Sequence, residues 1–109
     1  MKDAYIIDAI RTPIGNFGGT LSPVRVDDMG ALVMKELIAR NPSLDPNVIE
    51  DALMGCANQA GEDNRNVARM SVLLAGLPET IGGETVNRLC SSGMASTINA
   101  ARAIQVGAG

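Results

Sequence analysis

The chain has no histidine and no tryptophan, and only one phenylalanine and one tyrosine among its 109 residues. Without histidine, these residues cannot contain the Cys–His pair that commonly activates a thiol nucleophile. With an aromatic content of 2%, the core must be built from Ile, Leu, Val, Met and Ala, which suit close packing of helices on a sheet. The composition therefore favours α/β layers, and any thiol chemistry needs a base from outside these residues.

Nucleic-acid and membrane partners also lack support in the sequence. The nine Lys and Arg residues are scattered and the net charge is −3, so no basic stripe is present to neutralise a phosphate backbone. No apolar run approaches the roughly 18 residues of a membrane span, and the start of the chain lacks the apolar centre of a signal peptide. The sequence therefore predicts a cytoplasmic protein that binds neither nucleic acid nor membrane.

The two cysteines, Cys56 and Cys90, are too few to form a disulfide framework. In a reducing compartment, a thiol that stands at the junction of two secondary-structure elements is better explained by a chemical role than by a disulfide. Residues 13–24 form a predicted loop with three glycines, but their spacing matches neither nucleotide-binding fingerprint. We therefore predict no bound cofactor and no metal site.

Apolar periodicity predicts strands that alternate with helices. Short apolar runs predict strands at 4–10, 52–57 and 84–89. Helical spacing predicts helices at 27–40, 66–75 and 91–106, with a short turn at 46–50 and a polar loop at 58–65. This order calls for a parallel sheet with right-handed crossovers. Because the pattern expects a further strand next, we interpret the chain as truncated.

One thiol stands where the third predicted strand meets the third predicted helix. Unpaired amides and the positive dipole end at a helix start stabilise negative charge on the sulfur of Cys90, and the same amides can hold an oxyanion on a thioester carbonyl. Ser91 or Ser92 can cap the helix, and Gly93 leaves room for a substrate or a second backbone. The residues alone leave an alternative open, a buried core cysteine that merely precedes a helix.

The octet at 87–94, NRLCSSGM, resembles the nucleophile motif of the thiolases. Three further segments resemble the same family in the same order: DAIRTPIG at 8–15, GCANQAG at 55–61, and NVAR at 66–69 leading to LAGLP at 74–78. The run 55–69 is most similar to the 3-oxoadipyl-CoA thiolases of aromatic-compound breakdown. The resemblance implies the thiolase fold, a layered αβαβα architecture with a parallel or mixed sheet, in which residues 1–109 are part of the amino-terminal domain.

The resemblance also implies an acyltransferase that forms or cleaves 3-ketoacyl-CoA, in fatty-acid or aromatic-compound metabolism. Cys90 would be the catalytic nucleophile, accept the acyl group and pass it to CoA or to an acetyl-CoA carbanion. In the family, the activating histidine, a second cysteine that moves the substrate proton and the CoA-binding loop lie further along the polypeptide. We therefore expect residues 1–109 alone to be inactive. Cys56 does not match the motif of the second cysteine, and we predict a core thiol there.

Members of the family are homodimers or homotetramers that pair partly through the strand before the nucleophile and through the loop corresponding to 58–66. We expect Arg65, Arg69 and Arg88 to be solvated or interface charges. Two rival interpretations remain. One is a β-ketoacyl synthase, which also acylates a cysteine at a helix start. The other is a non-catalytic interaction or dimerisation fragment.

Overall fold

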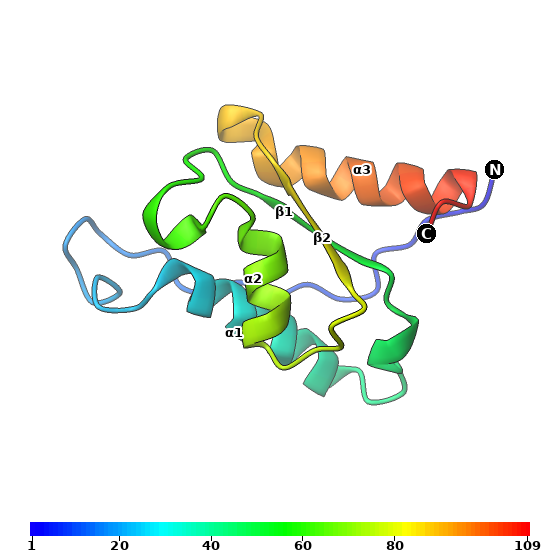
Figure 1. The fold of residues 1–109 in the computed structure, drawn as a ribbon, viewed down its shortest axis with the longest axis horizontal. Helices are drawn as coiled ribbons and strands as arrows, with labels where there is room; N and C mark the ends of the chain where they lie inside the picture. The colour runs from blue at the N-terminus through cyan, green and yellow to red at the C-terminus, as the bar shows by residue number, and fades with distance from the viewer.

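The computed structural model describes all 109 residues and arranges them in three layers (Figure 1). Helix α3 (Ser92–Val106) covers one face of a two-stranded sheet, while α1 (Val26–Arg40) and α2 (Val67–Leu74) lie on the other side. The strands β1 (Asp51–Gly55) and β2 (Gly82–Val86) are parallel. The predicted α/β layering with a parallel sheet is confirmed, and each predicted helix lies within one residue of its observed bounds at both ends.

The two strands bring their carboxyl ends to the same end of the sheet. Asp51 lies opposite Gly82 and Gly55 lies opposite Val86. The ladder continues one step beyond β1, because the Cys56 amide donates to the Val86 carbonyl at 2.9 Å. The loops that follow β1 and β2 therefore start side by side. Each of these loops carries a short 3-10 helix, and one more precedes β1: η1 (Pro46–Val48), η2 (Gly61–Asp63) and η3 (Leu89–Ser91).

The strand predicted at 4–10 does not form, and this prediction is wrong for the structure. The segment runs past the end of α1, where Arg40 makes an ion pair with Asp8 at 2.9 Å. Ile6 and Ile7 are 83% and 86% exposed. A strand is stabilised by ladder bonds to a neighbour, and the sheet contains only β1 and β2. The apolar pattern of this segment therefore has no partner to pair with.

The strand predicted at 84–89 begins and ends earlier, at Gly82 and Val86. Both Gly82 and Gly83, a residue type that weakens strand interiors, lie in β2. Glycine suits position 83 because α2 approaches closely, and a Cβ on Gly83 would lie 2.6 Å from the Arg69 amide nitrogen. Arg69 is also not the solvated charge we expected, since its guanidinium donates to backbone carbonyls, including that of Glu79 at 2.9 Å.

The core is small because the helices meet the sheet and each other through small residues. Of the 109 residues, 11 are buried: Asp27, Gly30, Ala31, Val67, Ala68, Ser71, Val72, Ile81, Ser92, Ala95 and Ser96. In α3, Met94 and Ile98, which the periodicity places along an apolar face, are exposed. Small side chains let two backbones approach closely, and the buried residues of α3 are accordingly Ser92, Ala95 and Ser96.

A buried carboxylate ties the loop after β1 to the start of α1. Asp27 is 2% exposed and accepts two hydrogen bonds from the Arg25 guanidinium, at 3.1 and 3.0 Å. These bonds hold the pKa of the Asp27 carboxyl below its ordinary value. The side chain of Asn64 donates to the same carboxylate at 3.3 Å, and Glu62 accepts from the Val26 amide at 3.1 Å. The loop is thus held at the amino end of α1.

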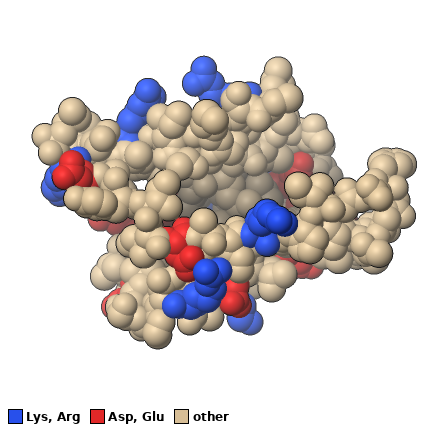
Figure 2. Space-filling view, turned by 180° about the vertical axis from the view of Figure 1, so that it is seen from behind, with Lys and Arg blue, Asp and Glu red and all other residues tan.

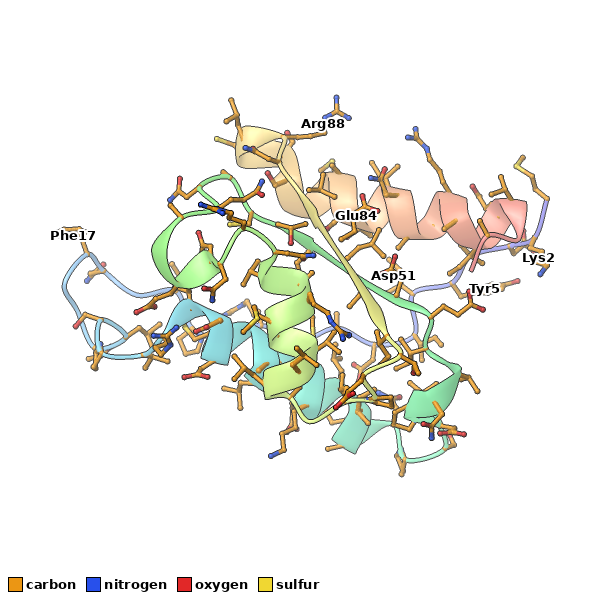
Figure 3. All side chains as sticks on the ribbon, in the orientation of Figure 1. Lys2, Tyr5, Phe17, Asp51, Glu84 and Arg88 are labelled. Carbon is orange, nitrogen blue, oxygen red and sulfur yellow. The ribbon has the colours of Figure 1, made fainter.

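The surface carries scattered charges. Figure 2 shows Lys and Arg side chains distributed singly or in small groups over the rear face, among larger areas of other residues. The predicted loop at 13–24 contains neither helix nor strand, and Phe17 at its tip points away from the body of the molecule (Figure 3). None of the helices combines the length and the apolar character that crossing a membrane requires.

Candidate active site

Cys90 lies in η3, the single 3-10 turn between the end of β2 and the start of α3, and its side chain is exposed. This is the strand-to-helix junction that the sequence predicts, with a short turn inserted before the α-helix begins at Ser92. The alternative of a core cysteine does not describe this structure, because Cys90 is exposed. The thiol is therefore placed where a reagent can reach it.

The backbone of this turn is strained at Leu89, the residue before the cysteine. Leu89 has φ +49°, a left-handed conformation that costs about 1–3 kcal/mol for a residue with a side chain. Three hydrogen bonds hold it. Asn87 Oδ1 accepts from the Leu89 amide at 3.0 Å, and Ser92 Oγ accepts from the Arg88 amide at 2.9 Å and donates to the Leu89 carbonyl at 2.6 Å. The turn is thus braced on both sides of Cys90.

The amide of Cys90 has no hydrogen-bond acceptor within the protein. The neighbouring amides of the turn are all engaged, since Arg88 and Leu89 donate to side chains and Ser91 donates to the Arg88 carbonyl at 3.0 Å. A free amide beside an exposed sulfur is able to stabilise an oxyanion formed by attack of that sulfur on a carbonyl. The turn therefore presents a nucleophile and a donor from the same residue.

The serines after Cys90 do not cap α3 as we expected. Ser91 occupies the N-cap position but its side chain makes no capping hydrogen bond. The hydroxyl of Ser92 is used to brace the preceding turn. Because a serine hydroxyl that donates to one backbone group and accepts from another is already satisfied, the tight turn before the helix takes the place of a conventional cap.

The glycine that permits a close backbone approach is Gly55, which the sequence reasoning missed. A Cβ built on Gly93 would meet nothing within 4 Å, so its position faces open space. A Cβ on Gly55 would overlap the backbone of Ser92 and Gly93 at the start of α3. The only signal in the sequence was a glycine at the end of an apolar strand run. Gly55 thus sets how closely the turn that carries Cys90 rests on β1.

The second cysteine belongs to the other loop. Cys56 is half-buried, and its thiol donates to Asp63 Oδ2 at 3.2 Å and accepts from the Gln59 amide at 3.4 Å. It is therefore less buried than the core thiol that we predicted, but it is engaged within its own loop. The two cysteine-bearing loops are linked by Asn87, whose Nδ2 donates to the Ala57 carbonyl at 3.1 Å.

A shallow hollow of about 360 Å³ lies beside the turn of Cys90. It is lined by Arg88, Ser91, Met94, Ala95 and Ile98. A second concavity of about 400 Å³ lies between the sheet and the last turns of α3, where Figure 3 shows Asp51 and Glu84, and it contains no cysteine. No three His, Cys, Asp or Glu side chains are grouped so as to hold a metal ion.

Arg88 lies at the turn with its side chain projecting outward (Figure 3). It is exposed, as is Arg65 in the loop after β1. Both therefore fit the expectation of solvated or interface charges, in contrast to Arg69.

Comparison with known proteins gives a consistent result. Residues 4–109 match the sequence profile described as the thiolase N-terminal domain. The chain is 60% identical over 109 residues to the 3-oxoadipyl-CoA/3-oxo-5,6-dehydrosuberyl-CoA thiolase of Escherichia coli, covering 100% of this chain and 27% of that protein. It is 58% identical over 106 residues to the beta-ketoadipyl-CoA thiolase of Pseudomonas aeruginosa, covering 97% and 26%.

The fold is also similar to solved structures. The crystal structure of the Acat5 thiolase from Ascaris suum, in complex with coenzyme A, superposes with a TM-score of 0.89 at 40% identity, covering 97% of this chain and 27% of that one. The chain thus spans about a quarter of the length of the curated relatives and of the solved structure that it matches.

Proposed function

Because the chain belongs to the thiolase family, through the N-terminal domain that residues 4–109 match, we propose that the polypeptide containing it is an acyltransferase acting through an acyl group on Cys90. The reaction is the formation or cleavage of 3-ketoacyl-CoA. The observation that carries the proposal is the exposed thiol of Cys90 next to its own free amide, in a braced turn before α3. The family match favours this activity over that of a β-ketoacyl synthase.

In the cleavage direction, the Cys90 thiolate adds to the 3-keto carbonyl carbon and the Cys90 amide donates to the developing oxyanion. The bond between carbons 2 and 3 then breaks, which leaves the acyl group on sulfur and an acetyl-CoA carbanion that takes up a proton. The thiol of a free CoA next attacks the acyl-cysteine, so that a shortened acyl-CoA leaves and Cys90 is regenerated. Synthesis follows the same steps in reverse.

The remaining catalytic groups lie outside residues 1–109 in this proposal. The chain has no histidine, and Cys56 is held within its own loop by Asp63. We propose that residues 1–109 are part of the N-terminal domain, and that the carboxy-terminal half supplies the activating histidine, the second cysteine and the CoA-binding loop. The relatives, which are about four times longer than the matched region, support this division.

The proposed substrates are CoA thioesters, with 3-oxoadipyl-CoA as the preferred 3-ketoacyl compound and no separate bound cofactor. The support is the identity of 57–60% to several thiolases named for the 3-oxoadipyl or beta-ketoadipyl compound. We propose that the protein acts in the cytoplasm in aromatic-compound metabolism.

The proposal is tested by acylation of the polypeptide that contains this chain. After brief incubation with acetoacetyl-CoA or 3-oxoadipyl-CoA, we expect mass spectrometry to find the acyl group on the peptide that carries Cys90, and we expect added CoA to remove it. Cys56 provides an internal control and should carry no label. Label on Cys56 alone, or no label at all, would contradict the proposal. The isolated 109-residue chain should give no turnover, because it lacks the activating histidine.

We also propose that the protein works as a homodimer or homotetramer. The isolated chain buries few residues and exposes large apolar side chains such as Ile14 and Phe17, and the outer edges of both strands are unpaired. We therefore expect residues 1–109 on their own to self-associate or to be only marginally stable. Size-exclusion chromatography with light scattering measures this. A single, tightly folded monomer would contradict the expectation.

A further inference from the structure

We propose that Asn87 is a positioning residue for Cys90, because its side chain joins the loop after β1 to the turn that carries the thiol. The inference rests on the proposed function, since it concerns how the acyl-accepting cysteine is aimed. Asn87 does not touch the sulfur in this arrangement. It acts through the backbone of Leu89.

The side chain of Asn87 makes two hydrogen bonds in different directions. Its Oδ1 accepts from the Leu89 amide at 3.0 Å, and its Nδ2 donates to the Ala57 carbonyl at 3.1 Å. The first partner is a donor and the second is an acceptor, so only one orientation of the carboxamide satisfies both. A carboxamide offers both functions without charge, on two separate atoms. The arrangement therefore fixes the turn of Cys90 relative to the loop that follows β1.

The hydrogen bond to Leu89 matters because this residue is left-handed, with φ +49°. A leucine in this region relaxes toward negative φ unless its surroundings hold it there. Rotation at Leu89 reorients the next residue, so both the Cys90 sulfur and its free amide would change direction. The Ser92 hydroxyl braces the turn from the helix side, through hydrogen bonds within the turn. The Asn87 side chain links the strained residue to the loop that follows β1.

A second substitution, at Leu89, is expected to suppress the effect of Asn87→Ala. Glycine adopts positive φ without steric cost, so Leu89→Gly removes the strain that Asn87 holds. If Asn87 acts by holding Leu89 left-handed, Leu89→Gly should restore much of what Asn87→Ala loses. A matched control is Asn99→Ala. This substitution also removes a hydrogen bond between a side-chain carboxamide and another element, the 3.4 Å bond to Glu84, on a part of α3 away from the turn.

The experiment uses the polypeptide that contains this chain, as the unsubstituted protein and as Asn87→Ala, Leu89→Gly, the double variant and Asn99→Ala. Two rates are measured for Cys90: acylation by acetoacetyl-CoA in a single turnover, and alkylation by iodoacetamide. Acylation needs the sulfur and the amide aligned on one carbonyl, whereas alkylation needs only an accessible and ionised sulfur. A loss of thiol ionisation lowers both rates, but a loss of aim lowers acylation alone, and thermal unfolding of each variant checks that it is folded.

We expect Asn87→Ala to slow acylation by about 10- to 100-fold, the loss that follows from a misplacement of about 1 Å. The KM for acetoacetyl-CoA and the alkylation rate should stay within about 3-fold of the unsubstituted protein, because binding and access are unchanged. The double variant should recover most of the acylation rate, and Asn99→Ala should acylate normally.

Undiminished acylation in Asn87→Ala would overturn the inference while leaving the proposed function intact. A parallel loss of acylation and alkylation would also overturn it, as would a double variant no faster than Asn87→Ala or an equal loss in Asn99→Ala. The proposed function fails in a different way, with no acyl group on Cys90 of the unsubstituted protein, and that result removes this inference with it.

Discussion

Replacement of Cys90 by serine is expected to lower kcat by about 10³-fold or more in the polypeptide that contains this chain, because a hydroxyl is far less readily ionised than a thiol and cannot form the acyl-thioester. The exposed sulfur makes no hydrogen bond within the protein, so the fold should not change. Turnover of acetoacetyl-CoA with CoA measures the effect, and thermal unfolding checks the fold.

Cys56→Ser is the matched control for this substitution. The Cys56 thiol donates to Asp63, and a serine hydroxyl is able to keep that hydrogen bond. We expect kcat to stay within about 3-fold of the unsubstituted protein, as for a residue that does not take part in the chemistry. A Cys90→Ser variant that retains more than a small part of the activity, or a Cys56→Ser variant that loses it, would show that Cys90 is not the nucleophile.

Alanine at Gly55 is expected to destabilise the protein by about 3 kcal/mol or more, because overpacking against a rigid backbone allows little relaxation. The added Cβ would overlap the backbone of Ser92 and Gly93, which are the first residues of α3. Neither side has a flexible side chain that could move away. The same displacement would shift the turn of Cys90, so acylation should fall together with stability. Urea unfolding followed by circular dichroism gives the change in free energy.

Gly93→Ala is the matched control for Gly55→Ala, because it makes the same glycine-to-alanine change at a position with space for a Cβ. It adds the same methyl group a short distance away, where a Cβ meets nothing within 4 Å. Alanine favours helix by up to about 1 kcal/mol relative to glycine, so we expect a neutral or slightly stabilising effect. Equal urea midpoints for Gly55→Ala and Gly93→Ala would mean that the close contact between β1 and α3 does not limit stability.

Local patterns predicted most of the elements. The helices follow from apolar spacing. Asn66, which the prediction places inside the second helix, occupies the N-cap position of α2 and accepts from the Arg69 amide at 3.3 Å. The parallel pair follows from the alternation of strands with helices, which leaves no short connection for antiparallel pairing. The position of Cys90 before a helix also follows, because both the strand and the helix that flank it carry clear patterns.

Contacts between distant segments were not predictable in the same way. The apolar pattern of segment 4–10 predicts a strand. Whether that strand forms depends on a neighbouring strand with a free edge, and the residues of the segment alone cannot show whether one is present. Gly82 and Gly83 both lie in β2, and at Gly83 helix α2 passes too close for a side chain. The exposure of Met94 was also not predictable, because apolar periodicity identifies one face of a helix but does not tell whether the sheet covers that face.

The amino-acid sequence by itself determined the family, the order and type of the helices and the two paired strands, and the place of Cys90 between strand and helix. These properties depend on local propensity and on motifs that are contiguous in the chain. Only the tertiary structure decided that Cys90 is exposed, that its own amide is free, and that Asn87 joins its turn to the loop after β1. Those features depend on distances between residues that are far apart in sequence, and such distances are set when the helices and the sheet pack together.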